Sequence, residues 1–369
     1  MSERLPIIDA AVHPMVQTAD ELKKYVPSPW NHSFWPGTER YHYPHPTSEY
    51  AGWTRPAGAL PGSDPELLSR HLFAERGFEQ AVLLPLTRGL IPDPALGSAV
   101  CRGTNEWLAQ TWLGEWNTEK RFKGTIRVNP MDPQAAVAEI EHWAGHPDMV
   151  QVGVPMESHA PYGERQFFKI WEAAEKHGLP VAVHPDFAPG VEFAPSPAGH
   201  PRWYVEFASF YSGTFFYHLS SWIAHGVFDH LEGFKVVFAD GGLDLLMPYM
   251  WRLDEHWRAL RYEHPWTKKE PTLYLKDHVR FVTQRMEGPE EPDKVPGWFE
   301  IAHADALLMY GSNYPHWTFA EPEAVVPATL AEQQRRRILF ENAAALYSPD
   351  QRGDRPSRNA ATPSLKSQL

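Results

Sequence analysis

Eight short apolar runs, separated by amphipathic or irregular stretches, constrain the fold of this chain more than any other feature. They lie at residues 5–12, 80–86, 122–128, 149–154, 180–184, 235–239, 279–283 and 306–311. Apolar runs that alternate with helical patterns are typical of parallel strands joined by helices. Eight such units make a (β/α)8 barrel, and a barrel of 369 residues folds as one unit. The sequence therefore predicts an α/β fold, a (β/α)8 TIM barrel, over residues 1–348.

Two of the intervening stretches have a clear helical period. In 163–177 the residues Phe167, Ile170 and Trp171 recur at helical spacing, and Gly178 suits a C-terminal cap. In 243–262 the apolar residues recur in the same way. Both stretches are predicted to be helices.

Three longer stretches fit no strand–helix unit and are rich in proline and aromatic residues. They are 27–64, 186–215 and 285–298, and each follows a predicted strand. Loops after barrel strands emerge at the face where such enzymes build their active sites. We expect these stretches to be loop insertions at that face. Residues 349–369 are polar and lack periodicity, so a disordered tail is expected there.

The charge and cysteine content exclude several classes of protein. The net charge is −12 without an offsetting basic cluster, which argues against a nucleic acid as partner. The single Cys101 excludes a disulfide framework and a thiolate zinc site, and it fits the reducing cytoplasm. The first residues lack the apolar segment of a signal peptide, and no apolar run is long enough to span a bilayer. A cytoplasmic protein with a small-molecule substrate is expected.

Polar residues stand at the ends of four of the predicted strands. His13 follows the first run, His184 the fifth, Asp240 the sixth, and Asn313 with His316 the eighth. Because the strand ends of a barrel meet at one rim, these side chains are expected to converge there. Imidazole nitrogens and carboxylate oxygens together suit zinc, iron or manganese. Asn313 would offer a neutral amide oxygen in place of a carboxylate.

Other interpretations of these residues remain open. A single histidine among 19 can be a hydrogen-bonded loop residue, and Asp240 can be a turn residue before Gly241 and Gly242. On the first strand, an alternation of period two predicts that Asp9, Ala11 and His13 share one face.

Several motifs occur together and in a fixed order. They are the opening Ile8-Asp9, Asp240-Gly241-Gly242, the stretch from Pro248 to Asp254, the block from His278 to Arg285, and Glu341-Asn342-Ala343. As a set they resemble the amidohydrolase-related family of the amidohydrolase superfamily. The resemblance is greatest to a subset that contains subunits of heteromeric iron/manganese monooxygenases, such as 2-aminoisobutyric acid hydroxylase.

The resemblance implies a metal site, from which this chain departs at two positions. The family carries a ligand where this chain has Ala11, and an aspartate where it has Asn313. The remaining set of implied metal ligands is His13, His184, Asp240 and Asn313, enough for one divalent metal but not two. Asp240 and His316 are the implied catalytic residues.

Three functions are therefore considered. The first is a subunit with a reduced metal site in a heteromeric monooxygenase, partnered by a paralogous barrel that carries the full site. The second is a stand-alone, metal-dependent hydrolase or non-oxidative decarboxylase of a small carboxylated substrate, alone or as a homo-oligomer. The third is a barrel that only binds or scaffolds.

Overall fold

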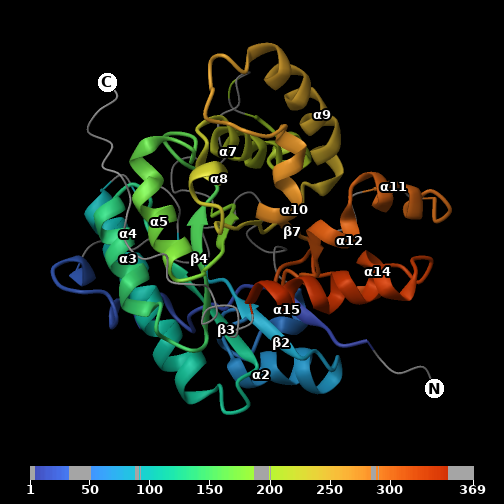
Figure 1. The fold of residues 1–369 in the computed structure, drawn as a ribbon. Helices are drawn as coiled ribbons and strands as arrows, with labels where there is room; N and C mark the ends of the chain where they lie inside the picture. The colour runs from blue at the N-terminus through green and yellow to red at the C-terminus, as the bar shows by residue number, and fades with distance from the viewer. Residues whose placement is uncertain are drawn as a thin grey trace.

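The protein is a barrel of eight parallel strands surrounded by helices, as the sequence predicts (Figure 1). This computed structural model describes residues 5–32, 51–87, 91, 93–186, 199, 201–283, 288–289 and 291–347. The strands pair in the order β1 to β8, each with its neighbour in the chain. They are β1 Ile8–Val12, β2 Gln80–Leu83, β3 Phe122–Arg127, β4 Met149–Pro155, β5 Val181–His184, β6 Val236–Phe238, β7 Val279–Val282 and β8 Leu308–Met309.

The helices lie outside the strands and follow them around the barrel (Figure 1). The α-helices are α1 Ala19–Lys23, α2 Pro65–Ser69, α3 Pro94–Trp107, α4 Pro133–Trp143, α5 Phe168–Lys176, α6 Tyr204–Phe210, α7 Gly213–Ala224, α8 Val227–His230, α9 Leu243–Leu260, α10 Leu275–His278, α11 Val295–Ile301, α12 Ala304–Leu307, α13 Pro322–Val325, α14 Glu332–Arg336 and α15 Asn342–Tyr347. The 3-10 and π-helical segments are η1 Trp30–His32, η3 Gly52–Thr54, η4 Arg70–Glu75, η5 Leu108–Glu115, η6 Arg165–Phe167, η7 Pro271–Tyr274 and η8 Arg337–Glu341.

Backbone hydrogen bonds join the last strand region to the first and so close the barrel. Ala10 N donates to Tyr310 O at 2.9 Å, and His13 N donates to Tyr314 O at 2.7 Å. The same seam carries the bond from Asn313 N to Ala11 O at 3.1 Å. The segment after β8 is thereby held against the end of β1.

Apolar side chains fill the barrel and also join it to the surrounding helices. The interior cluster includes Val82, Ala182, Val237 and Met309, and Tyr347 of α15 lies among them. The Tyr347 hydroxyl donates to Gln151 Oε1 at 3.0 Å. The C-terminal helix therefore helps to fill the barrel interior rather than only covering its outside.

The prediction that Asp9, Ala11 and His13 share one face of the first strand is wrong. A bulge shifts the register of β1 against β2 between Asp9 and Val12, and the consecutive residues Ala10 and Ala11 both belong to the interior cluster. An extra residue in one strand reverses the alternation beyond it. Asp9 accepts instead from the backbone N–H groups of Ala11 and Ser312, at 3.2 and 2.9 Å.

Helices occupy parts of the stretches that were expected to be loops. Helix α6 and the start of α7 lie within 186–215, and α11 begins within 285–298. Glu206 explains the start of α6, since its carboxylate accepts from the backbone N–H groups of Arg202 and Trp203. Strand β8 is shorter than the run 306–311 because α12 takes residues up to Leu307.

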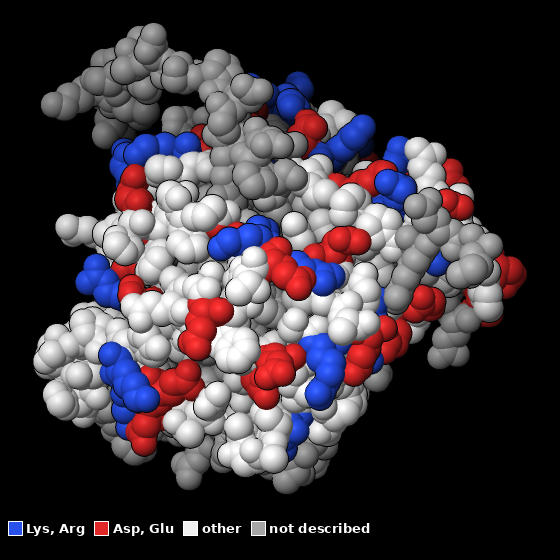
Figure 2. Space-filling model, turned by 90° about the horizontal axis from the view of Figure 1, so that it is seen from below, with Lys and Arg blue, Asp and Glu red and all other residues white. Residues whose placement is uncertain are grey.

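Several expectations lie outside the described residues. They are residues 33–50 in the first long stretch, 187–198 and 200 in the second, 285–287 and 290 in the third, and the tail 349–369. Within the described part of the chain, no helix combines the length and apolarity needed to cross a bilayer. Figure 2 shows acidic and basic side chains interspersed on the face that it draws.

Candidate metal centre

His13 leaves the end of β1 with one ring nitrogen bonded and the other unpartnered. Its Nδ1 lies 2.9 Å from Leu84 O, and because a carbonyl only accepts, Nδ1 carries the proton. Nε2 is buried and has no hydrogen-bond partner among the described residues. Burial, and next the neighbouring His184, lower the pKa of His13 to about 3. The ring is therefore neutral at physiological pH, with the Nε2 lone pair available to a metal.

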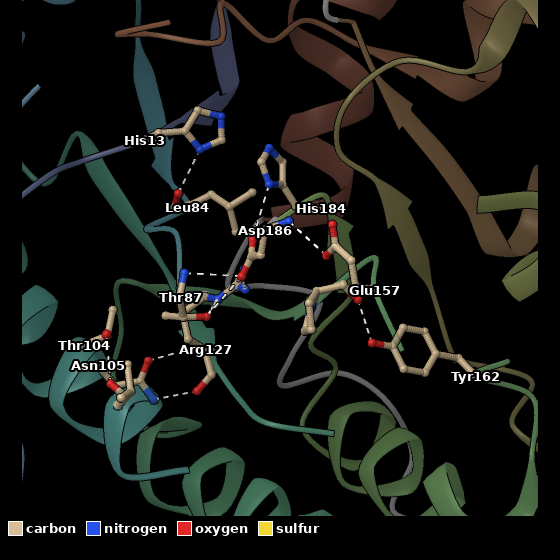
Figure 3. A network of polar contacts seen from close by, with 12 residues as sticks. His13, Leu84, Thr87, Thr104, Asn105, Arg127, Glu157, Tyr162, His184 and Asp186 are labelled. Carbon is tan, nitrogen blue, oxygen red and sulfur yellow. Dashed lines mark hydrogen bonds and ion pairs between the residues drawn. The ribbon is translucent and has the colours of Figure 1, made fainter. Parts of the chain in front are cut away.

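His184 ends β5 and faces His13. The two ring centroids are 4.6 Å apart, and the ring planes are inclined by 48°. His184 Nδ1 lies 3.5 Å from Asp186 Oδ1, and Figure 3 shows this nitrogen turned toward the carboxylate, away from His13. Both histidines thus have Nδ1 turned toward an oxygen, as metal-binding imidazoles usually do. The His13 contact is a hydrogen bond, whereas the 3.5 Å contact of His184 with Asp186 is not.

Asp186 belongs to a buried polar group that the sequence did not reveal. Arg127, at the end of β3, forms an ion pair with Asp186 Oδ2, and both side chains are completely shielded from solvent. The Thr87 hydroxyl donates to the same oxygen at 3.1 Å, and Glu157 Oε2 accepts from Asp186 N at 3.1 Å. Figure 3 shows Asp186 between Arg127 and His184. Arg127 ends a predicted strand, but an arginine there does not point to Asp186, so no local signal could have found this group.

Asn313 lies beside His13 on the segment after β8. Its backbone has φ of 58°, a left-handed conformation that asparagine adopts more readily than most residues. Its Nδ2 donates to Thr318 Oγ1 at 2.7 Å, and the side chain also interacts with His13, where it opposes part of the lowering of the His13 pKa. Asn313 is thus brought to His13, as expected.

Asp240 and His316 lie on the same rim. Burial raises the pKa of Asp240 above its usual range, and the charge of nearby His184 and the Tyr211 side chain lower it in part. Tyr211 also donates to the backbone carbonyl of Asp240 at 2.9 Å. His316 is half-buried, and its Nδ1 lies 2.7 Å from Thr318 Oγ1.

Two imidazole nitrogens and one amide oxygen could hold a divalent cation whose other coordination positions stay open. They do not form the closed ligand set of a structural metal site. Within the described residues, no three His, Cys, Asp or Glu side chains are grouped closely enough to hold a metal. His13 and His184 offer two imidazole nitrogens, and Asn313 offers a neutral oxygen. Asp240 interacts with His184 but does not join the two histidines as a third close ligand. Two or three protein ligands leave positions for substrate.

Comparison with known proteins shows the family. A family model described as amidohydrolase matches residues 8–348, and the chain belongs to this family. No curated protein matches the sequence. The match confirms the resemblance at the level of the family.

Solved structures that share the fold include several decarboxylases. The chain is similar to 5-carboxyvanillate decarboxylase from Sphingomonas paucimobilis, with 20% identity, a TM-score of 0.64, and 93% of this chain and 99% of the other covered. It is similar to 2,6-dihydroxybenzoate decarboxylase from Rhizobium, with 18% identity, a TM-score of 0.65, and coverage of 94% and 100%.

A third similar structure contains a metal. It is an aspartate-to-asparagine mutant of 5-carboxyvanillate decarboxylase from Novosphingobium aromaticivorans with bound manganese and 3-methoxy-4-hydroxy-5-nitrobenzoic acid. Its identity is 17%, its TM-score 0.63, and 93% of this chain and 97% of the other are covered. At these identities the likeness establishes the barrel fold.

Proposed function

We propose that this protein is a metal-dependent, non-oxidative decarboxylase of a small carboxylated aromatic substrate. The observation that carries the proposal is the facing pair of His13 and His184, each with Nδ1 turned toward an oxygen. Asn313 beside His13 would supply a third ligand, so that these three residues would hold one divalent cation at the rim. The decarboxylases of the same fold and the manganese-bound mutant support both the reaction and the metal.

Asp240 is the proposed proton donor. Decarboxylation breaks the bond between the ring carbon and the carboxyl group, and the electron pair of that bond remains on the ring carbon. A proton must then reach this carbon. A carboxyl group whose pKa is raised by burial keeps its proton closer to neutral pH than an exposed one, which suits a general acid. His184, which lies close enough to influence Asp240, keeps donor and cation at one rim.

A bound divalent cation would stabilise the negative charge of the substrate oxygens and of the carbanion as it forms. The neutral Asn313 cancels none of that positive charge, whereas an aspartate would cancel one unit. His316, half-buried on the same segment as Asn313, is proposed to orient the substrate.

The comparisons favour this decarboxylase hypothesis over the monooxygenase subunit. The solved structures of the same fold described above are decarboxylases, and a hydroxylating partner subunit is not needed for this reaction. The expectation of a paralogous partner or a homo-oligomer remains a prediction.

The proposal is tested by measuring CO2 release from 2,6-dihydroxybenzoate and 5-carboxyvanillate by the purified chain supplied with Mn2+ or Zn2+. We expect release from at least one of them, and at least a hundredfold loss in Asp240→Asn, in line with the removal of a general acid. Surface residue His142 provides the control, since His142→Ala should retain the rate. If the metal-loaded protein releases no CO2 from either substrate, the proposal is wrong as to substrate class. If Asp240→Asn retains the rate, it is wrong as to the proton donor.

A further inference from the structure

The hydroxyl group of Thr318 lies between Asn313 and His316 and contacts both. Asn313 Nδ2 is 2.7 Å from Thr318 Oγ1, and His316 Nδ1 is also 2.7 Å from it. The Thr318 side chain is buried, so these two contacts are not shared with bulk solvent. The three residues lie within a single segment after β8, tied to β1 through Asn313 N.

The direction of each hydrogen bond follows from the single proton of the hydroxyl group. The backbone N–H of Thr318 donates to His316 Nδ1 at 3.3 Å, so Nδ1 is an acceptor and carries no proton. The hydroxyl must then donate its only proton to the same nitrogen. Toward Asn313, the hydroxyl oxygen can only accept.

A residue at position 313 must therefore present a donor to Thr318. The amide of asparagine does so through Nδ2, whereas an ionised aspartate has only acceptors and would compete for the one hydroxyl proton. With Nδ2 fixed on Thr318, the amide oxygen is directed to the other side. The Asn313 side chain also interacts with His13, and with Nδ2 on Thr318 the amide oxygen is the atom left for that interaction.

We propose that Thr318 is a positioning residue that holds the Asn313 amide with Oδ1 toward His13 and His316 as its Nε2–H tautomer. Asparagine is then a selected neutral ligand rather than a decayed aspartate. A neutral ligand at position 313 would leave the full positive charge of the cation to attract an anionic substrate. Only this statement about the substrate rests on the proposed function. The backbone contributes as well, since His316 N donates to Asn313 O at 2.8 Å and holds the turn.

The test compares Thr318→Val, which removes the hydroxyl group and keeps the shape, with Thr318→Ser, which keeps the hydroxyl group. The ring 15N chemical shifts of His316 are measured on metal-free protein, with His316→Gln to assign the signals. We expect the shifts of a single Nε2–H tautomer in the wild type and in Thr318→Ser. In Thr318→Val only the longer bond from the backbone N–H still favours this tautomer, so a larger share of the Nδ1–H tautomer is expected. Asn313→Asp should shift the tautomer balance as well, because the carboxylate takes the hydroxyl proton.

Binding of Mn2+ provides a second readout. Thr318→Val should weaken Mn2+ binding about tenfold, as loss of a residue that orients a ligand commonly does, and Thr318→Ser should restore it. Unchanged tautomer and unchanged Mn2+ affinity in Thr318→Val would overturn the inference. Because the tautomer is read without metal or substrate, the absence of decarboxylation would refute the proposed function and leave this result standing.

Discussion

Arg127 and Asp186 form an ion pair that is completely buried, and the same Asp186 carboxylate lies 3.5 Å from His184 Nδ1. Burial alone would raise the pKa of Asp186, but the positive charge of Arg127 and the contact with His184 hold it below the usual range. The carboxylate therefore stays charged and oriented. It lies on the Nδ1 side of His184, at a distance longer than a hydrogen bond, and the other nitrogen is left for the rim of the barrel.

Removing one partner of this pair should destabilise the fold strongly. Arg127→Met leaves a buried carboxylate without its counter-charge, and we expect a loss of about 3–5 kcal/mol in the free energy of unfolding, measured with urea. Arg258→Met is the matched control, since the Arg258–Glu270 pair is exposed to solvent and should contribute little. The double variant Arg127→Met/Asp186→Leu should recover much of the loss. Equal losses in Arg127→Met and Arg258→Met would contradict this account.

The stability of the protein should depend on pH through Asp9. Burial raises the pKa of Asp9 to about 7, while hydrogen bonds from Ser312 and Ala11 lower it in part. Between about pH 4 and 7 the folded chain keeps a proton that the unfolded chain has lost, so stability falls as pH rises. The loss amounts to at most about 4 kcal/mol from this group.

Asp9→Asn should remove that dependence. It keeps an acceptor for the two backbone N–H groups and carries no charge, so urea unfolding should show it more stable than the wild type at pH 8 and similar at pH 4. Asp20→Asn, at an exposed carboxyl group on α1, serves as control and should leave the slope unchanged. A wild-type slope that persists in Asp9→Asn would show that Asp9 titrates normally.

Restoring a carboxylate at position 11 should destabilise the metal-free barrel. Ala11 is buried and lies in the apolar interior cluster. We expect Ala11→Asp to lose more than about 2 kcal/mol without metal. Addition of Mn2+ should return part of that loss if the new carboxylate reaches the cation. Ala331→Asp, at the exposed start of α14, should cost nothing. Equal stability of the two variants would show that position 11 is not confined.

The sequence predicted the barrel because each strand is a short apolar run. Such a run can be recognised without knowing which residues it contacts. It predicted the pairing of His13 and His184 because the ends of parallel strands share one rim. Helix α6 was missed because its start depends on Glu206 bonding to backbone N–H groups, which composition does not reveal. Arg127 and Asp186 were missed because a buried ion pair joins residues 59 positions apart, and neither has a local pattern. The bulge in β1 was missed because an alternating pattern of residues does not show where a strand contains an extra residue.

The central claim is that one divalent cation is bound between His13 and His184, and pulsed electron paramagnetic resonance of Mn2+ bound to the purified protein tests it most directly. We predict nitrogen couplings from two histidines in the wild type and in His142→Ala, and from one histidine in each of His13→Ala and His184→Ala. The couplings should disappear in the double variant. A spectrum of bound Mn2+ without histidine coupling in the wild type, or one that is unchanged by both substitutions, would contradict the account.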